Sequence, residues 1–233
     1  FKKDLRLEDN EALYEASKDF KLLPIYIIDK DQWNQVAYSD RQWQFCKECL
    51  IELKEELILR GQPLVIRTGK VSEIFDDLNK NFKIRGIYSH QETGDFYSYN
   101  RDKKIKNWAS DKNIEWKEYL QFAVFRGKLN RDYWSNKWRE HIKKEIPNNN
   151  NKLGRLSINI GNFPSDDFFE FKNDLCEGRL RGGRKEGLKK LDSFINKRIN
   201  SYSKNISDPN KSFDSCSRLS PYITWGCLSL REI

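Results

Sequence analysis

The sequence predicts an α/β fold, with a Rossmann-like parallel sheet and flanking helices, followed by a linker and then by helices alone. Through residues 1–120, short apolar runs alternate with longer amphipathic stretches, which is the pattern of parallel strands joined by helices. Beyond about residue 180 the apolar periodicity is helical, without a strand signal of comparable strength. We therefore divide the chain into an α/β domain at 1–120, a linker region at 121–180 and the beginning of a helical domain at 181–233.

Short apolar runs bounded by turn residues predict the strands. They are LLPIYII (22–28), PLVIR (63–67), IRGIYSH (84–90) and IEWKE (114–118). The opening FKKDLRLEDNEALYEA is interpreted as the tail of a further strand, a loop, and a helix capped near Asp9.

Amphipathic stretches predict the helices. The first long one opens with a capping-box spacing, Ser39 to Gln42, and Gly61 ends it. Its apolar positions recur in steps of three and four: Trp43, Cys46, Leu50, Leu53 and Leu57. Further helices are expected at 71–82 with Ser72 as its cap, at about 96–111, and at 131–146 before the loop PNNNNKLG.

Composition narrows the class of protein. The chain has 43 Lys and Arg against 35 Asp and Glu, a formal net charge of +8. This balance fits a nucleic acid or another polyanion as partner. A generally basic, lysine-rich proteome explains the same balance. No apolar run approaches the ~20 residues that span a bilayer, and no signal peptide opens the chain. Five irregularly spaced cysteines do not form a disulfide framework, so we expect a cytoplasmic protein.

Both ends of the sequence suggest a fragment. The chain has no Met, so Phe1 is not a translation start, and CLSLREI breaks off without a helix stop signal. We expect the chain to be cut at both ends.

The cysteines and histidines carry little signal for chemistry. Cys46 and Cys49 have a metal or redox spacing, but zinc needs four ligands, no second pair exists, and Cys46 lies on the apolar stripe of a helix. Core packing is the favoured interpretation. His90 ends a predicted strand at the sheet edge where ligands bind in such folds, yet a strand-end turn explains it better. With His141 as the only other histidine, a histidine cluster is excluded.

Two basic stretches suggest nucleotide or nucleic-acid binding. RGGRKEG (181–187) has the glycine separation of a phosphate loop, but it lacks both the following Lys-Ser/Thr and a preceding strand, so we reject that interpretation. KLNRDYWSNKWREHIKK (128–144) interleaves basic and aromatic residues, as nucleic-acid surfaces do. A linker helix that buries Trp134 and Trp138 is the slightly favoured alternative.

The stretch CSRLSPYITWGCLSL (216–230) is the strongest candidate site. Ser220 and Pro221 suit a helix start, with Ser220 at the cap. Ser217 and Arg218 stand just before it, where backbone N–H groups and an Arg fork favour a phosphate. For this stretch considered alone, an ordinary capped helix with an Arg salt bridge is the favoured interpretation.

Four segments together resemble the photolyase/cryptochrome family, in the order in which that family carries them. FKKDLRLEDNEAL resembles its R-x-D-L-R-x-x-D-N segment, and LPIYIID resembles its second strand. SHQETG…NRDKKIKNW is similar to its H-x-E-T-G…R-D segment, and CSRLSPYITWGCLS is similar to its flavin-binding segment T-S-x-L-S-P-Y-L-x-x-G-x-L-S. Only the region near 145–180 is weakly matched.

The resemblance implies a chromophore-holding α/β domain followed by an all-helical FAD-binding domain. The positions that would contact FAD are Tyr202, Cys216, Ser217, Arg218, Leu219 and Ser220. Cys216 departs from the usual Thr, and a thiol is the weaker hydrogen-bond donor. Tyr97 and Ser98 stand where folate-binding members have Asn-Glu, so we do not expect folate in that manner. A second antenna chromophore of unknown identity is left open.

The activity implied by the resemblance is light-driven electron transfer from reduced FAD to pyrimidine dimers in DNA, by a monomer without a membrane segment. The catalytic residues are expected beyond Ile233, none within this chain, so the chain alone should neither hold FAD tightly nor repair DNA. One alternative is a signalling cryptochrome without repair activity. The other is a free-standing α/β nucleotide-binding adaptor, whose helices after residue 180 would pack onto the sheet as one domain.

Overall fold

The computed structural model describes residues 1–233 except 19–20, 123, 127–129, 166 and 172–175. Its described strands are β1 (Ile25–Ile28), β2 (Val65–Thr68), β3 (Gly86–His90) and β4 (Glu115–Tyr119). They form two parallel pairs, β1 with β2 and β3 with β4. The predicted parallel α/β fold is thus confirmed.

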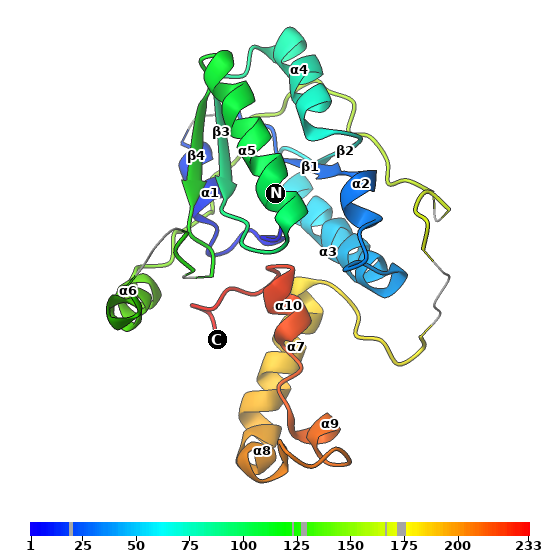
Figure 1. Cartoon of the computed structure of the whole chain (residues 1–233), viewed down its shortest axis with the longest axis vertical. Helices are drawn as coiled ribbons and strands as arrows, with labels where there is room; N and C mark the ends of the chain where they lie inside the picture. Colours follow the sequence, from blue (N-terminus) through cyan, green and yellow to red (C-terminus); the bar gives the residue numbers. More distant parts are fainter. Residues whose placement is uncertain (19–20, 123, 127–129, 166, 172–175) are drawn as a thin grey trace.

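Helices connect and cover these strands. In the first part of the chain they are α1 (Glu11–Ala16), α2 (Lys30–Trp33), α3 (Asp40–Leu59), α4 (Val71–Phe82) and α5 (Phe96–Asp111). Both α1 and α5 contact the β3–β4 pair, and they do so from opposite faces (Figure 1). Both faces of that pair are therefore covered, as parallel sheets require.

The longest helix, α3, follows the sequence closely. The Ser39 N–H donates to Gln42 Oε1 at 3.1 Å, one half of the predicted capping box. Gly61 follows the helix with a φ of +103°, a conformation that glycine adopts without strain. The predicted stripe is buried: Trp43, Cys46, Leu50, Leu53 and Leu57. Because each fully buried leucine contributes about 1.5–3 kcal/mol, this face anchors the core.

One local prediction is confirmed and two are wrong. The cap of α1, predicted near Asp9, is Asn10, whose side chain accepts a hydrogen bond from the Leu13 N–H at 2.9 Å. Lys70 precedes α4, which places Ser72 inside that helix. Residues 1–10 form no strand; the Phe1 backbone nitrogen donates to the Ile25 carbonyl at 2.8 Å, but no ladder continues from it. Tertiary contacts of the opening segment therefore override its local pattern.

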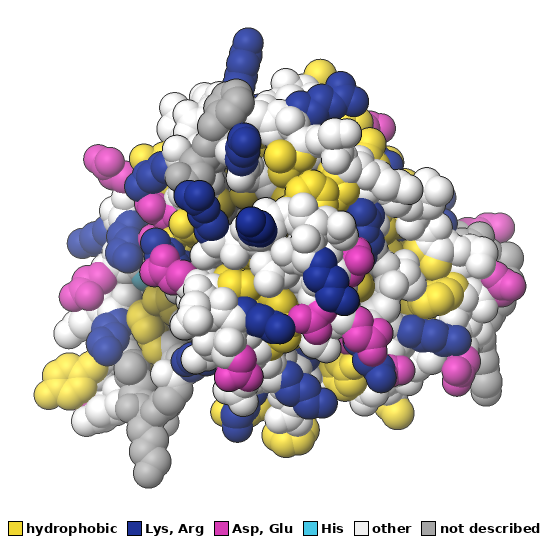
Figure 2. Space-filling model, turned by 90° about the horizontal axis from the view of Figure 1, so that it is seen from above, with side chains coloured by type: hydrophobic (Ala, Val, Ile, Leu, Met, Phe, Trp, Pro, Cys, Tyr) yellow, Lys and Arg dark blue, Asp and Glu magenta, His cyan; other side chains and the backbone are white. Residues whose placement is uncertain are grey.

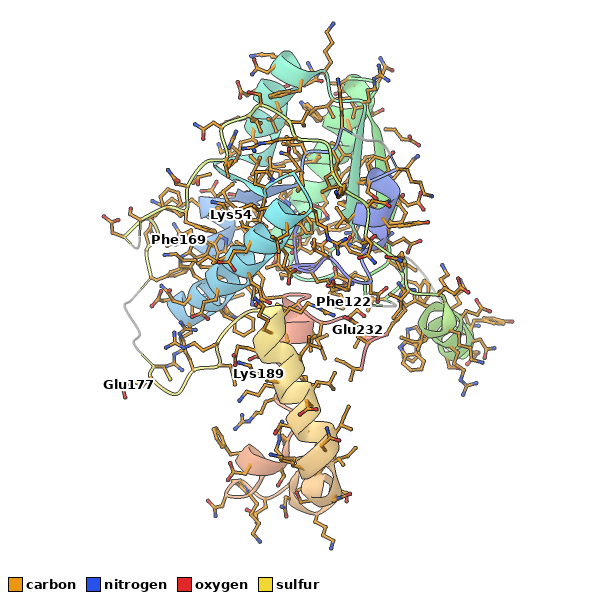
Figure 3. All side chains as sticks on the ribbon, turned by 180° about the vertical axis from the view of Figure 1, so that it is seen from behind. Lys54, Phe122, Phe169, Glu177, Lys189 and Glu232 are labelled. Carbon is orange, nitrogen blue, oxygen red and sulfur yellow. The ribbon has the colours of Figure 1, made fainter. Side chains whose placement is uncertain are left out.

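The linker region crosses the α/β domain in an irregular conformation. Among the described residues of 144–183 there is no helix or strand. The Leu153 N–H donates to Arg60 O, and the Ile66 N–H donates to Ile160 O, both at 2.7 Å. Phe169, labelled in Figure 3, packs its ring 4.8 Å from that of Trp43. The segment thus closes one side of the core.

The remaining linker helix, α6 (Arg131–Lys143), corrects another prediction. Trp134 and Trp138 are 46% and 37% exposed, so they are not buried as the favoured interpretation required. Figure 1 shows α6 standing at the side of the α/β domain. His141, near its end, is buried, whereas the described side chains of 132–140 are exposed, many of them charged.

The C-terminal part is helical. It holds α7 (Arg184–Ser193), a π-helical turn η1 (Phe194–Arg198), α8 (Ile199–Asn205), α9 (Ser212–Ser215) and α10 (Ser220–Thr224). Figure 1 shows η1, α8 and α9 extending away from the sheet, while α10 returns to it. Tyr222, Trp225, Cys227 and Leu228 share one buried cluster with Trp33 and Leu50. None of the helices in the described part of the chain has the length and apolarity that a bilayer crossing demands.

Candidate functional site

Residues Cys216–Ser220 connect α9 to α10. Leu219 is 3% exposed and anchors this segment in the core, whereas Cys216, Ser217 and Arg218 are half-buried and Ser220 is exposed. The Ser217 hydroxyl oxygen accepts a hydrogen bond from the Leu219 N–H at 3.4 Å. One apolar anchor therefore holds a polar segment at the surface.

The start of α10 differs from the prediction. Ser220 is the first helical residue, Leu219 occupies the cap position, and no side chain caps the helix. The helix has only five residues, so few peptide dipoles add up along it. Anion binding here would depend on loop N–H groups and side chains rather than on a helix dipole.

The Arg218 side chain packs against Phe213. Its φ of +61° lies in the left-handed region, which non-glycine residues rarely adopt. Its guanidinium carbon lies 3.8 Å from the centroid of the Phe213 ring, and its Nε donates to the Phe213 carbonyl at 3.2 Å. The two terminal nitrogens have no partner among the described residues, so they are free to bind an anion.

Tyr202 lies on α8, which packs against α9, the helix before this segment. Its ring packs edge-on against Phe194, with centroids 5.6 Å apart. One turn further along, Asn205 Nδ2 donates to Ser215 Oγ at 2.8 Å, and one turn earlier Arg198 donates to the Cys216 carbonyl. The structure therefore brings α8 against α9, and the turn that precedes α8 against Cys216.

The exposed donors fit the phosphate part of a nucleotide. The N–H groups of Ser217 and Arg218 have no acceptor in the described part of the chain. Together with the Arg218 terminal nitrogens and the Ser220 hydroxyl, they form a set of donors of the kind that phosphate oxygens accept. The assignment of flavin-contacting residues made from the sequence stays a prediction, and these backbone amides are further donors on the same segment.

A small cavity lies at the carboxyl edge of the strands. Trp225, which follows α10, stacks on Trp33 with centroids 5.4 Å apart and ring planes 6° apart, a pair worth about 0.5–1.5 kcal/mol. The cavity measures about 30 Å³, room for one or two water molecules. It is lined by Phe1, Lys2, Lys3, Tyr26, Ile27, Gln32, Trp33, Tyr38, Glu92, Arg101 and Trp225.

His90 is a core residue. It is 2% exposed, and its Nδ1 lies 2.7 Å from Asp4 Oδ2. Burial by itself raises the pKa of Asp4, but the hydrogen bond with His90, the nearby N-terminal amine and the Lys2 N–H together outweigh burial and lower that pKa. The structural interpretation of His90 is favoured accordingly.

Sequence patterns did not reveal the buried ion pairs beside this cavity. Arg101 lies 2.6 Å from Glu92 and 2.9 Å from Asp102. Burial alone lowers the pKa of Arg101, but these two carboxylates outweigh it and raise that pKa. The Arg-Asp dipeptide in the family-like segment was the available signal. Nearby, the Tyr97 hydroxyl donates to Asp29 at 2.9 Å, and Ser98 is buried as part of a helix cap.

The rejected motifs act as packing elements. A Cβ at Gly182 would overlap the Phe45 carbonyl, so this glycine serves close packing against α3. Cys46 and Cys49 are fully buried in the core. No group of three or more His, Cys, Asp or Glu suited to a metal ion occurs among the described residues.

Comparison with known proteins decides the family. The family model described as DNA photolyase matches residues 1–126, more than half of the chain. The chain belongs to the DNA photolyase/cryptochrome family. The resemblance and the fold class inferred from the sequence are thereby confirmed.

Photolyase/cryptochrome relatives of both kinds match this member. Cryptochrome DASH, chloroplastic/mitochondrial, of Arabidopsis thaliana is 37% identical over 100 residues, 40% of this chain and 18% of the relative. Deoxyribodipyrimidine photo-lyase of Buchnera aphidicola is 26% identical over 252 residues, 99% of this chain and 51% of the relative. The cryptochrome of Synechocystis sp. PCC6803 has the same fold, with a TM-score of 0.80, 20% identity, and coverage of 100% of this chain and 53% of that one. The chain thus spans about half the length of the relatives that it matches from end to end.

Proposed function

We propose that the whole protein is a blue-light-dependent flavoprotein that repairs pyrimidine dimers in DNA by electron transfer from FAD. The observation that carries this proposal is the Cys216–Ser220 segment, in which the N–H groups of Ser217 and Arg218 have no acceptor among the described residues. Membership of the photolyase/cryptochrome family supports it. We take the protein to be a cytoplasmic monomer.

The chain's own residues would bind and orient the cofactor. Arg218, Ser220 and the N–H groups of Ser217 and Arg218 would hold the phosphates, and Leu219 fixes their segment in the core. FAD, when bound and reduced, would supply the photoexcited electron. Because the catalytic residues are expected outside residues 1–233, this chain's part is binding and orientation.

The charge balance suits a DNA substrate. The net charge of +8 favours contacts with phosphates, which release counterions. On the face shown in Figure 2, Lys and Arg are interspersed with Asp and Glu rather than gathered in one patch. We therefore expect this face to contribute little to DNA binding.

The test uses the whole protein expressed from the complete reading frame. We expect flavin absorbance to co-purify with it, and thymine dimers in an oligonucleotide to disappear under blue light but not in darkness. The same preparation kept in darkness is the control. Repair equal in light and darkness, or no repair with flavin bound, would contradict the proposal.

A cryptochrome photoreceptor without repair activity is the second candidate. The identity of 37% over 100 residues to cryptochrome DASH of Arabidopsis thaliana favours this candidate. Bound flavin with a light response and no dimer repair would establish this alternative.

A free-standing nucleotide-binding adaptor is the third candidate. The shared core of Tyr222, Leu228 and the α/β residues favours it, because the C-terminal segment partly packs on the sheet domain. A whole protein that purifies without flavin and does not bind added FAD would support this candidate.

A further inference from the structure

Arg198 ends the π-helical turn η1 and places its whole guanidinium against backbone and side-chain acceptors. Its Nε donates to Ser193 Oγ at 3.2 Å, and its Nη2 donates to Lys190 O at 2.9 Å. Its terminal nitrogens also reach across to the next segment, Nη1 to Cys216 O and Nη2 to Ser217 O, the latter at 3.3 Å. One side chain therefore joins the α7–η1 helix to two consecutive carbonyls of the candidate phosphate segment.

The π-helical turn provides this reach. In η1 the Ile199 N–H bonds to the Phe194 carbonyl five residues earlier, instead of four. Such wide turns occur frequently at functional sites. The guanidinium also lies 5.7 Å from the centroid of the Phe194 ring, which restricts its orientation.

Holding these carbonyls fixes two peptide planes. Both peptide bonds are trans, since the described chain has no cis peptide, so each N–H points opposite to the C=O of its own plane. With the carbonyls of Cys216 and Ser217 directed at Arg198, the N–H groups of Ser217 and Arg218 face away from it. These are the two amides without an acceptor in the described structure. Arg218, which follows the second of these peptides, has a left-handed φ of +61°.

We propose that Arg198 is a positioning residue for the phosphates of the flavin nucleotide, a role that rests on the function proposed above. It does not itself contact the phosphate. It holds the 216–217 and 217–218 peptides so that two N–H donors point at the ligand. The planar fork is essential, because its donors lie on three separate nitrogens that reach acceptors on both the helix and the segment. The three donors of a lysine ammonium all lie on one atom.

The experiment measures phosphate binding by the chain itself. A ¹⁵N-labelled sample of residues 1–233 is titrated with inorganic pyrophosphate at constant ionic strength, and the amide resonances of Ser217 and Arg218 are followed by NMR. The variants are Arg198→Gln, Arg198→Lys and the matched control Lys197→Gln, which removes one neighbouring, exposed charge. Thermal unfolding of each variant reports whether it is folded.

We expect pyrophosphate to shift both amides in the parent chain. Arg198→Gln and Arg198→Lys should each weaken binding by about tenfold, the effect of misaligning charge-assisted hydrogen bonds, while Lys197→Gln changes it less than about twofold. Parent-like binding by Arg198→Lys would show that Arg198 acts through its charge, and would overturn the proposal. So would unchanged binding by Arg198→Gln, and so would a parent chain whose Ser217 and Arg218 amides do not respond.

A second measurement separates this inference from the proposed function. In the whole protein, FAD and riboflavin affinities are compared by flavin fluorescence for the parent and Arg198→Lys. A loss of affinity for FAD but not for riboflavin, which lacks phosphate, supports the positioning role. Tight FAD binding that the substitution leaves unchanged would refute the role of Arg198 while the flavin-binding function stands.

Discussion

The Sγ atoms of Cys49 and Cys227 lie 3.1 Å apart, although 178 positions separate these residues in the chain. Cys49 belongs to α3, and Cys227 follows α10, so their contact joins the α/β domain to the C-terminal helical part. Both are buried, and the Gly183 N–H donates to Cys49 Sγ at 3.1 Å. The two parts of the chain are thus packed into one core at this point.

This burial predicts which thiols react. Burial raises the pKa of Cys46 and Cys49, so they stay protonated at neutral pH, and Cys227 is fully buried beside them. In the native chain we expect a disulfide reagent such as DTNB to label only the half-buried Cys176 and Cys216. Labelling of all five cysteines in denaturant is the control. Rapid native labelling of Cys49 or Cys227 would show that the two parts do not pack together in solution.

Gly226 should tolerate no side chain. Its φ is +69°, and a Cβ there would overlap the Lys3 carbonyl oxygen. Gly226→Ala should lower the free energy of unfolding by about 2–4 kcal/mol, measured by urea denaturation. The control is Gly178→Ala, because no atom lies within 4 Å of a Cβ at that position, and it should change the value by less than about 0.5 kcal/mol. Equal effects of the two substitutions would contradict the close contact.

Glu56 makes stability fall as the pH rises toward neutrality. Burial, together with the nearby carboxylates of Glu8 and Glu52, raises its pKa from 4.5 to about 7. Between these values the folded chain binds more protons than the unfolded chain, so this group's contribution to stability decreases with rising pH. Glu56→Gln should remove that contribution. The Tm of the variant minus the Tm of the parent should therefore increase as the pH is raised from about 4.5 to 7.

The control for this titration is Glu55→Gln on the exposed side of α3. Its Tm difference from the parent should stay flat across the same pH range. A flat profile for Glu56→Gln would mean that Glu56 is ionised in the folded chain as in the unfolded one.

The contribution of Asp4 to stability depends on pH in the opposite direction to that of Glu56. Its pKa is lowered in the folded chain, so its contribution is present above its ordinary value of 3.8 and is lost as the pH falls below it. Asp4→Asn leaves His90 without its buried carboxylate and should cost about 3 kcal/mol near neutral pH. Urea denaturation measures this, with the exposed Asp111→Asn as control. A cost below about 1 kcal/mol would indicate that the pair is relaxed or hydrated.

Sequence reasoning succeeded where the signal is local. The capping box at Ser39 and the apolar stripe from Trp43 to Leu57 predicted α3, because helix periodicity and caps depend on residues three or four positions apart. The same reasoning misplaced the cap of α4 and the start of α10 by one or two residues. At those positions packing and chain direction outweigh side-chain preference.

The candidate site was predicted only in part. Tyr202 and Cys216–Ser220 followed from motif resemblance and stay a prediction; the structure packs α8, which carries Tyr202, against α9. Arg198 was missed, since a basic residue at the end of a helical stretch is usually solvated and no pattern shows which carbonyls it binds. The exposure of Trp134 and Trp138 was missed for a related reason: aromatic spacing predicts an apolar face but not whether anything packs against it.

The sequence by itself determined the parallel α/β fold, its long amphipathic helix and its family, because these depend on short-range periodicity and on ordered motifs. The tertiary structure alone decided that Cys49 meets Cys227, that Asp4 meets His90, and that Arg198 holds the segment before Arg218. The physical reason is that the partners in these contacts lie far apart in the sequence. Contacts between residues far apart depend on how whole elements pack, and local propensity contains no record of that packing.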